Sequence, residues 1–317
     1  MYNTELKTRF AKEFTESESL RKACLHLFNY FEKYENEWQA DLCTKDAETL
    51  RPIINSIIGM RVISSRTRLN ILRNYGKWCM HNKVPGSCNG VLDVIPDNID
   101  KVRSQMIRNP KHLQKCLDEI FAPESANTVD NTYRCFYWLA YAGMKEEDIL
   151  KVKGCDVRFD IMSVVYNGNA YPLYRESLEA FQKCVSMNQF VYMHPNYSRD
   201  KVVYRDRAEG DELVRGIRAM PKVNAMRTEL SKKSRKAREE NQTEMCLSYF
   251  RVWLSGIFYR LYESELAGDE PDFKGLVDFL ANGKEYKVSS GRNTQESKRR
   301  RLASEYAADY RRWKMTL

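Results

Sequence analysis

The chain has 317 residues, of which 43% are hydrophobic and 30% are charged. This balance excludes intrinsic disorder and is typical of a globular protein long enough for about two domains. A net charge of +9 favours a polyanionic partner, although a charge excess alone is weak support for one.

No apolar run approaches the ~20 residues that cross a bilayer, so we expect no membrane span. The N-terminal stretch MYNTELKTRFAKEF is charged throughout and lacks the apolar centre of a secretory signal, which predicts a cytosolic protein. The nine cysteines form no CxxC pair and predict reduced, mostly buried thiols. The spacing of Cys79, His81 and Cys88 fits no standard zinc finger, so we expect neither a metal nor another cofactor.

Residues 1 to about 120 are predicted to be all-helical. Apolar residues at helical spacing predict a helix over 20–38, and a second helix begins near Asp46. The segment SSRTRLNILRNYGKWCMHNKVPG predicts a third helix that begins at its serine cap and ends before Pro85. One face of this helix is apolar, and the other carries Arg66, Arg68, Arg73 and Lys77. Two shorter helices are expected in DNIDKVRSQM and NPKHLQKCLDEIF.

The loop FAPESANT marks the predicted boundary between one domain over 1–120 and another over 121–317. After it, TVDNTYRCFYWLAYAG predicts a buried helix that stops at Gly143, and the acidic residues of KEED suit the first turn of a short helix. The alternation and the Asn-Gly pair in IMSVVYNGNAYPLY predict a β-hairpin, followed by a helix in RESLEAFQKCVS. The rest is predicted to be mainly helical, apart from the charged loop HPNYSRDKVVYRDRAEGDE and a break at ANGKEYKVSSGRNTQ.

This order of elements resembles the tyrosine recombinase (phage integrase) family. The likeness covers nearly the whole chain, and its most specific part is AGMKEEDILKVKGCDV, where a turn, an acidic first turn and the entry to a strand coincide. The resemblance implies a mainly α fold. A helical core-binding (SAM-like) domain would be followed by a catalytic-type domain with a small β-hairpin or sheet.

In that family, an arginine after the turn, a hairpin lysine, an H-x-x-R pair and a C-terminal tyrosine nucleophile together cleave DNA. The cations stabilise negative charge on the phosphoryl oxygens, and a guanidinium offers a bidentate fork where a lysine offers a point charge. This chain has Lys145 at the first arginine position, no lysine in the hairpin turn, and Ser255 or a neighbour at the second arginine position. Tyr306 or Tyr310 is left as the tyrosine, and the position of Tyr310 beside Trp313 favours packing.

The concerted loss of these donors predicts a recombinase fold without strand transfer, and therefore no enzyme. An alternative alignment shifts the boxes by a few residues, so that Arg251 or Arg260 serves. That alternative leaves Lys145 and the lysine-free hairpin turn unexplained.

The segment PKVNAMRTELSKKSRKAREEN is the expected main DNA contact, because its cations face only one early acid, Glu229. An apolar stripe of Val223, Met226 and Leu230 can dock it on the protein. A solvated helix face is the alternative reading. The block of Arg292 and 298–301 fits a phosphate contact and a polar linker equally well.

Serine and threonine beside the cations of the N-terminal module, Ser64, Ser65 and Thr67, suit phosphate contacts. The residues expected to contact DNA are Arg66, Thr67, Arg68, Arg73, Lys77, Arg205, Arg207, Arg227, Lys232, Lys233, Arg235, Lys236, Arg238 and Arg251.

Among recombinase-like proteins, the chain further resembles the master repressors of lysogeny of SPbeta-like temperate phages of Bacillus. This resemblance implies a nucleoid-associated repressor of the bacterial cytoplasm that binds double-stranded DNA at phage operator elements and is released by a phage-encoded regulator. Self-association is a further expectation from the family. Two alternatives stay open: an active integrase or resolvase with an unusual site, and an accessory protein that binds another recombinase.

Overall fold

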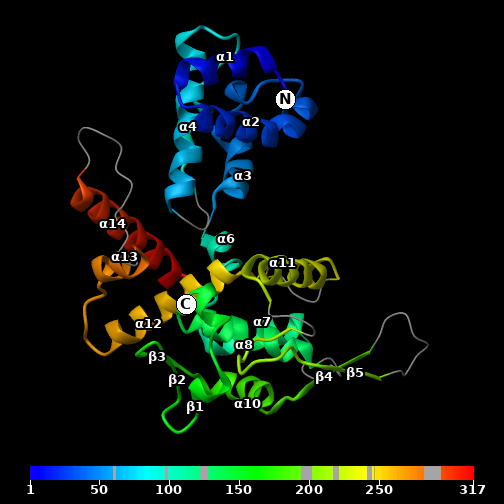
Figure 1. The fold of residues 1–317 in the computed structure, drawn as a ribbon. Coiled ribbons are helices and arrows are strands. Elements are labelled where there is room, and N and C mark those ends of the chain that lie inside the picture. The colour runs from blue at the N-terminus through cyan, green and yellow to red at the C-terminus, as the bar shows by residue number, and fades with distance from the viewer. Residues whose placement is uncertain are drawn as a thin grey trace. The chain divides into compact units, whose positions relative to one another are not determined.

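The protein is mainly helical and carries two small antiparallel sheets, which confirms the predicted fold class (Figure 1). The computed structural model describes residues 1–59, 62–96, 99–121, 128–193, 202–216, 221–240, 245, 247–281 and 294–317. Its α-helices are α1 (Thr4–Phe14), α2 (Glu18–Trp38), α3 (Ala47–Ile57), α4 (Val62–His81), α5 (Gly90–Asp93), α6 (Ile99–Arg103), α7 (Pro110–Ile120), α8 (Val129–Tyr141), α9 (Glu146–Ile149), α10 (Leu178–Ser186), α11 (Val223–Glu239), α12 (Tyr249–Leu266), α13 (Phe273–Ala281) and α14 (Gln295–Lys314). Its strands are β1 (Val157–Arg158), β2 (Ser163–Tyr166), β3 (Asn169–Pro172), β4 (Gln189–Met193) and β5 (Val202–Asp206), and its 3-10 turns are η1 (Leu42–Thr44), η2 (Gly154–Asp156) and η3 (Arg175–Ser177).

The chain divides into two compact units. Unit 1 comprises Met1–Val102 with Tyr286–Asp309, and unit 2 comprises Arg103–Glu285 with Tyr310–Leu317. This division falls before α7, whereas the predicted domain boundary follows residue 120. The reason is that Arg134 of α8 donates to the Asp118 carboxylate at 2.7 Å and to carbonyls at the end of α7, which binds α7 to unit 2.

The core of unit 1 is built on aromatic rings from its long helices. Phe10 of α1, Phe28 of α2 and Tyr75 of α4 are each at most 1% exposed. The Tyr75 ring lies 5.2 Å from that of Phe10 and 4.8 Å from that of Phe28, centroid to centroid. Such contacts combine large apolar burial with favourable ring geometry, so they fix how α1, α2 and α4 pack.

A buried ionic network lies beside these rings. Lys7 and Glu35 are fully buried, and the Lys7 ammonium donates to both oxygens of the Glu35 carboxylate. Asp41 accepts a hydrogen bond from the Tyr75 hydroxyl at 3.0 Å, and the backbone N–H of Leu42 donates to Glu35 at 2.9 Å. Because each charge has a partner, the desolvation cost of the network is offset, and α1 is tied to α2.

The helices predicted over 20–38 and from Asp46 are confirmed as α2 and α3, and Asp46 caps α3 by accepting from the N–H of Thr49 at 2.8 Å. The serine start predicted for α4 is wrong, because the helix already begins at Val62. Ser65 lies inside α4, is buried, and donates its hydroxyl proton to the Gly59 carbonyl at 3.0 Å.

Unit 2 is organised around α8, which packs against α10 and α12. Its side chains from Cys135 to Tyr141 are all at most 1% exposed, which confirms the predicted buried helix. The helix stops as predicted, since Gly143 adopts a φ of +95° that side-chain-bearing residues rarely take.

The predicted hairpin is confirmed as β2 and β3, which pair antiparallel. Its turn residues Asn167 and Gly168 both have positive φ, as a tight hairpin turn requires, and β1 adds a third antiparallel strand. The hairpin of β4 and β5 was not predicted, and the loop prediction is wrong for Val202–Asp206. Residues 194–201 of the predicted loop lie outside the described residues, as do 282–293 of the predicted break, whereas 207–212 contain neither a helix nor a named strand, as predicted.

The prediction of mostly buried thiols is confirmed within the described ranges, where Cys155 is exposed, Cys88 is half-buried, and the buried free thiols are Cys24, Cys43, Cys79, Cys116, Cys135 and Cys184. None of the described helices combines the length and the apolar character needed to cross a bilayer. Among the residues that the structure describes, no cluster of His, Cys, Asp and Glu side chains could hold a metal ion.

Candidate nucleic-acid interface

Lys145 follows the turn at the end of α8 and serves as the N-cap residue of α9. Its ammonium lies 3.5 Å from the carbonyl oxygen of Phe279 in α13 and 5.0 Å from the centroid of the Phe279 ring. The cation at the position of the family's first arginine is therefore engaged with α13, by a carbonyl and an aromatic face.

The turn itself is covered by one face of α12. The Tyr249 hydroxyl donates to the Met144 carbonyl at 2.9 Å, the Trp253 indole to the Gly143 carbonyl at 3.0 Å, and the Arg260 guanidinium to the Tyr141 carbonyl at 2.7 Å. Between them, Gly256 allows the backbones to touch, since a Cβ there would lie 1.8 Å from the Tyr141 carbonyl oxygen. These donors satisfy the turn carbonyls and leave the turn rigid.

The alternative alignment placed Arg251 or Arg260 in the site. Of the two, Arg260 is the residue that the structure brings to the turn carrying Lys145, because its guanidinium lies against Gly143. Arg251 is half-buried at the start of α12, and its carbonyl accepts a hydrogen bond from Ser255.

Ser255 is fully buried and connects α12 to the segment before α7 through hydrogen bonds. Its hydroxyl donates to the Arg251 carbonyl at 2.7 Å and accepts from the backbone N–H of Ile107 at 3.0 Å. The position aligned with the family's second arginine therefore holds the chain segment before α7 against α12, with no cationic group there.

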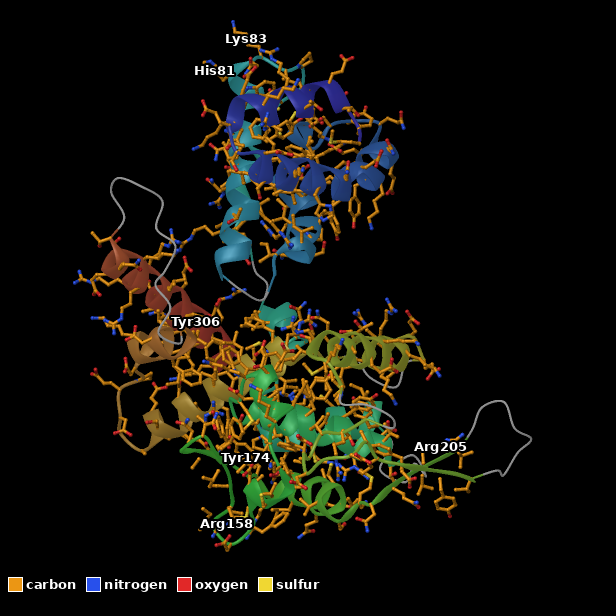
Figure 2. All side chains as sticks on the ribbon, viewed as in Figure 1. His81, Lys83, Arg158, Tyr174, Arg205 and Tyr306 are labelled. Carbon is orange, nitrogen blue, oxygen red and sulfur yellow. The ribbon has the colours of Figure 1, made fainter. Side chains whose placement is uncertain are left out.

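Tyr310 of α14 is 3% exposed, and its ring stacks on Trp313 with centroids 5.9 Å apart. Its hydroxyl donates to the carboxylate of Glu265, which also accepts from the Lys314 ammonium at 2.8 Å. Burial raises the pKa of Tyr310, and the hydrogen bond to Glu265 raises this pKa further. These contacts keep the phenol protonated, whereas a nucleophile needs the opposite. Tyr306 is also largely buried, at 9% exposure (Figure 2).

The basic segment predicted as the main DNA contact forms α11, with Met226 and Leu230 buried as expected. Two of its cations are used to dock the helix. Arg227 donates to the carboxylate of Glu146, which is only 2% exposed, with its Nε 2.6 Å away. Lys233 pairs with Asp130 at 2.7 Å and lies over the rings of two aromatic residues, Phe121 and Tyr133.

The other cations of α11 are exposed, namely Lys232, Arg235, Lys236 and Arg238, and so is the N-cap residue Lys222. Arg235 and Lys236 form only long ion pairs with acids at the end of the same helix. The Arg235 Nε lies 3.9 Å from a carboxylate oxygen of Glu239, and the Lys236 Nζ lies 3.6 Å from one of Glu240. Exposed pairs of this kind contribute little to stability, so these side chains can turn to a phosphate at small cost.

Burial and nearby carboxylates also set the protonation state of Tyr249. Burial raises the pKa of Tyr249, and the charges of Glu146 and Glu147 raise it further. The hydrogen bond that Arg227 donates to the Glu146 carboxylate raises the pKa of Arg227. The phenol therefore stays a donor to the turn, and the guanidinium stays charged.

Arg207 was predicted to contact DNA but is buried inside unit 2. It is 8% exposed, and its guanidinium donates to the carbonyls of Cys184, Met187 and Leu213 at 3.1, 2.6 and 2.7 Å. It is thus an interior group that joins the end of α10 to the segment after β5, and we correct its assignment as a DNA contact. Arg205, in contrast, is exposed on β5 (Figure 2).

In unit 1, α4 presents its predicted basic face. Arg66, Arg73 and Lys77 are exposed and recur at helical spacing, opposite the buried Ile71 and Leu72. Arg73 approaches the Val94 carbonyl at 3.4 Å. Arg68 donates to the Ile57 carbonyl, which turns it away from this face toward α3, and Thr67 is exposed beside it. The side chain of Ser64 lies outside the described part of the chain.

The second basic block lies at the start of α14. Arg299 and Arg300 both pair with Glu296, at 3.5 and 2.9 Å, and Arg301 approaches Glu305 at 3.7 Å. Arg292 lies outside the described residues. Paired charges within one helix suit a solvated face as well as a phosphate contact, so both readings of this block stay open.

Several important groups were missed by sequence reasoning. Glu146 was expected only to complement a helix dipole, and Asp130 only to precede a buried helix, yet both are acids that dock α11. Tyr249 and Trp253 had no assigned role, although they bind the turn. In the sequence both acids stand among polar residues at the start of a helix, so no signal separated them from ordinary capping acids.

Comparison with known proteins bears on unit 1. Residues 1–81 match the family model described as MrpR, N-terminal core-binding domain. The match ends at His81, the last residue of α4, and so includes α1 to α4. No curated protein matches the chain. The match supports a relationship of this N-terminal module to the DNA-binding core-binding domains of the tyrosine recombinase-like family.

Proposed function

We propose that the protein is a sequence-specific repressor of a temperate phage. It binds double-stranded DNA at operator elements in the bacterial nucleoid, maintains lysogeny, and has a recombinase-like frame without strand-transfer activity. In this it resembles the master repressors of SPbeta-like phages of Bacillus, and a phage-encoded regulator would release it from its operators.

The proposal depends mainly on the environment of Lys145. Its ammonium contacts the Phe279 carbonyl and ring. As an ammonium, it also lacks the planar bidentate fork that an arginine presents to a phosphate. Ser255 adds no cation, and the hydroxyl of Tyr310 is bonded to Glu265. Because loss of a single donor typically lowers a rate by about 10²–10³, this combination supports a protein that binds DNA without cutting it.

DNA contact is assigned to two faces, one in each unit. In unit 1 it is the exposed face of α4 with Arg66, Arg73 and Lys77, within the segment that matches a core-binding domain. In unit 2 it is the exposed side of α11, named here the α11 basic face and made of Lys232, Arg235, Lys236 and Arg238. Phosphate contacts would supply most of the affinity, and base contacts the choice of sequence.

The test is binding of the full chain to fragments of phage genomic DNA, by gel shift and fluorescence anisotropy across salt concentrations. With six to ten neutralised phosphates, affinity should fall roughly 10³–10⁵-fold between 50 and 200 mM salt. Changing all four residues of the α11 basic face to alanine should weaken binding and flatten the salt dependence.

A matched control changes Lys111, Lys115, Lys151 and Lys183 to alanine, which removes the same charge from exposed positions elsewhere in unit 2. The α11 assignment is wrong if both quadruple variants behave alike. Absence of any specific shift would reject the repressor and favour an accessory protein that binds another recombinase.

One observation favours a second candidate, an active recombinase with an unusual site. Arg260 lies against Gly143, at the turn that carries Lys145. Incubation with supercoiled substrate distinguishes the candidates. A covalent protein-DNA adduct that disappears in Tyr306→Phe or Tyr310→Phe would establish the enzyme, whereas the repressor should bind the same DNA and leave it intact.

A further inference from the structure

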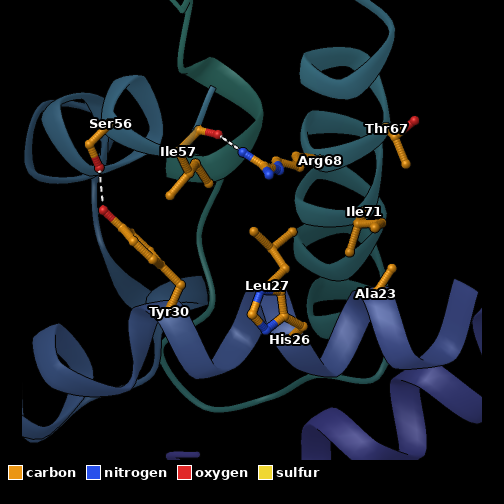
Figure 3. Close-up of a pocket in the computed structure, with 9 residues that line it drawn as sticks. All are labelled: Ala23, His26, Leu27, Tyr30, Ser56, Ile57, Thr67, Arg68 and Ile71. Carbon is orange, nitrogen blue, oxygen red and sulfur yellow. Dashed lines mark hydrogen bonds between the residues drawn. The ribbon is translucent and has the colours of Figure 1, made fainter. Parts of the chain in front are cut away.

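We propose that unit 1 contains a binding pocket for a small apolar carboxylate, formed between α2, α3 and α4 (Figure 3). The cavity has a volume of about 480 Å³. This volume lies in the range of pockets that accept metabolite-sized molecules. Its lining residues are Ala23, His26, Leu27, Tyr30, Ser56, Ile57, Thr67, Arg68 and Ile71.

The floor of the pocket is apolar and formed by largely buried side chains. Leu27, Ile57 and Ile71 come from three different helices and are 6%, 5% and 2% exposed. Ala23, one turn before Leu27 on α2, adds only a methyl group, and the small side chain leaves the space open. A hydrocarbon chain or ring placed here would exchange water for contacts with branched side chains, which is favourable.

One charged group faces this apolar floor. Arg68 lines the pocket and donates from one nitrogen to the Ile57 carbonyl, which orients the guanidinium over the cavity (Figure 3). A guanidinium carries five N–H donors and binds carboxylates in a bidentate manner. None of the lining residues is acidic, so no residue of the pocket competes with a bound anion.

Tyr30 and Ser56 form a polar part of the pocket wall, and the polar side chains of His26 and Thr67 also line the pocket. The hydroxyls of Tyr30 and Ser56 are 2.7 Å apart and satisfy one another, which makes this wall a poor partner for a strongly polar ligand. The pocket thus offers one permanently charged cation, Arg68, above a hydrocarbon floor. A monocarboxylate with an apolar body fits this chemistry, whereas a sugar or a nucleotide would leave its hydroxyl groups unpaired.

Isothermal titration calorimetry of the full chain with decanoate tests the proposal, with 1-decanol as the neutral comparison. We expect one site with a Kd on the order of 100 µM for decanoate, and weaker binding of decanol. Arg68→Met should weaken decanoate binding at least tenfold and leave decanol binding unchanged. Ala23→Phe, at an exposed helix position, should fill the cavity and abolish binding of both.

Lys22→Met is the matched control, because it removes the same charge from a neighbouring exposed position outside the pocket. Circular dichroism melting of each variant verifies that the fold is kept. The proposal is overturned if decanoate fails to bind, if Ala23→Phe binds it as the original chain does, or if Lys22→Met weakens binding as much as Arg68→Met. The measurement contains no DNA, so its result is independent of the proposed repressor activity.

Discussion

The carboxylate of Glu146 in α9 and the guanidinium of Arg227 in α11 form an ion pair in which the acid is 2% exposed and the arginine side chain 55% exposed. The strongly basic helix α11 is therefore held partly by one of its own cations. Lys233, paired with Asp130, has the same function about one and two-thirds turns further along the helix. Docking of α11 and the proposed contact with DNA thus use different members of the same basic segment.

Because Glu146 is buried and Arg227 is exposed, removing one partner of the pair should lower the stability more than removing the other. Arg227→Met leaves a carboxylate buried without a partner and should cost about 3 kcal/mol or more of unfolding free energy. Glu146→Gln leaves an arginine that can reach water, so we expect a loss of about 1–2 kcal/mol. The double variant should recover part of the loss of Arg227→Met. Denaturant melts of the four proteins form the double-mutant cycle, and strict additivity would show that the pair contributes nothing.

The contact between α8 and α12 predicts a strong effect of a single methyl group. Gly256→Ala would bring a Cβ to 1.8 Å from the Tyr141 carbonyl oxygen and force the two backbones apart. We expect a loss of at least about 3 kcal/mol, measured by thermal and denaturant unfolding.

Gly76→Ala is the control for this substitution, since it also lies inside a helix and its Cβ would meet the nearest atom, in Val91, at 3.4 Å. Alanine there should be neutral or add up to about 1 kcal/mol through helix propensity. Equal effects of the two substitutions would contradict the close approach of α8 and α12.

Features fixed by local chemistry could be predicted from the sequence. The buried helix α8, its stop at Gly143 and the hairpin turn at Asn167 and Gly168 each follow from a few adjacent residues. The start of α4 was missed because serine is a good N-cap by local preference, whereas Ser65 bonds instead to the Gly59 carbonyl from inside the helix.

Features that depend on distant partners could not be predicted. Glu146 and Arg227 are separated by 81 positions, and no spacing in the sequence signals their pairing. Arg207 stands in a charged segment and was expected to be exposed, yet carbonyls from three places in the chain converge on it. The candidate site was predicted as a set of residue types, and only tertiary contacts separate docking cations from exposed ones.

The contacts of Tyr310 predict a structural role for its hydroxyl. Tyr310→Phe keeps the ring on Trp313 and loses the hydrogen bond to Glu265, so it should cost about 1 kcal/mol of stability and leave DNA affinity unchanged. Tyr310→Ala also removes the ring and should cost about 3–4 kcal/mol. Thermal melts and DNA titrations of both variants provide the measurement. A selective loss of DNA cleavage in Tyr310→Phe would instead assign the phenol to catalysis.

His112 predicts an acid-sensitive element in unit 2. Its Nδ1 accepts hydrogen bonds from the backbone N–H and the side chain of Arg108, at 3.2 and 3.5 Å, which requires a neutral imidazole. Burial, followed by the charges of Arg108 and Lys115, lowers the pKa of His112 to about 4 from its usual 6.5.

Because this pKa is depressed in the folded protein, the unfolded chain takes up a proton first as the pH falls. Stability should therefore decrease between about pH 6.5 and pH 4, by about 1–2 kcal/mol once solvent screening of a half-buried side chain is allowed for. His112→Asn keeps an acceptor near the Nδ1 position and does not titrate, so it should remove this part of the acid sensitivity. Denaturant midpoints of both proteins at pH 7.5 and pH 4.5 decide the matter. An equal loss of stability on acidification in both would assign the effect to other groups.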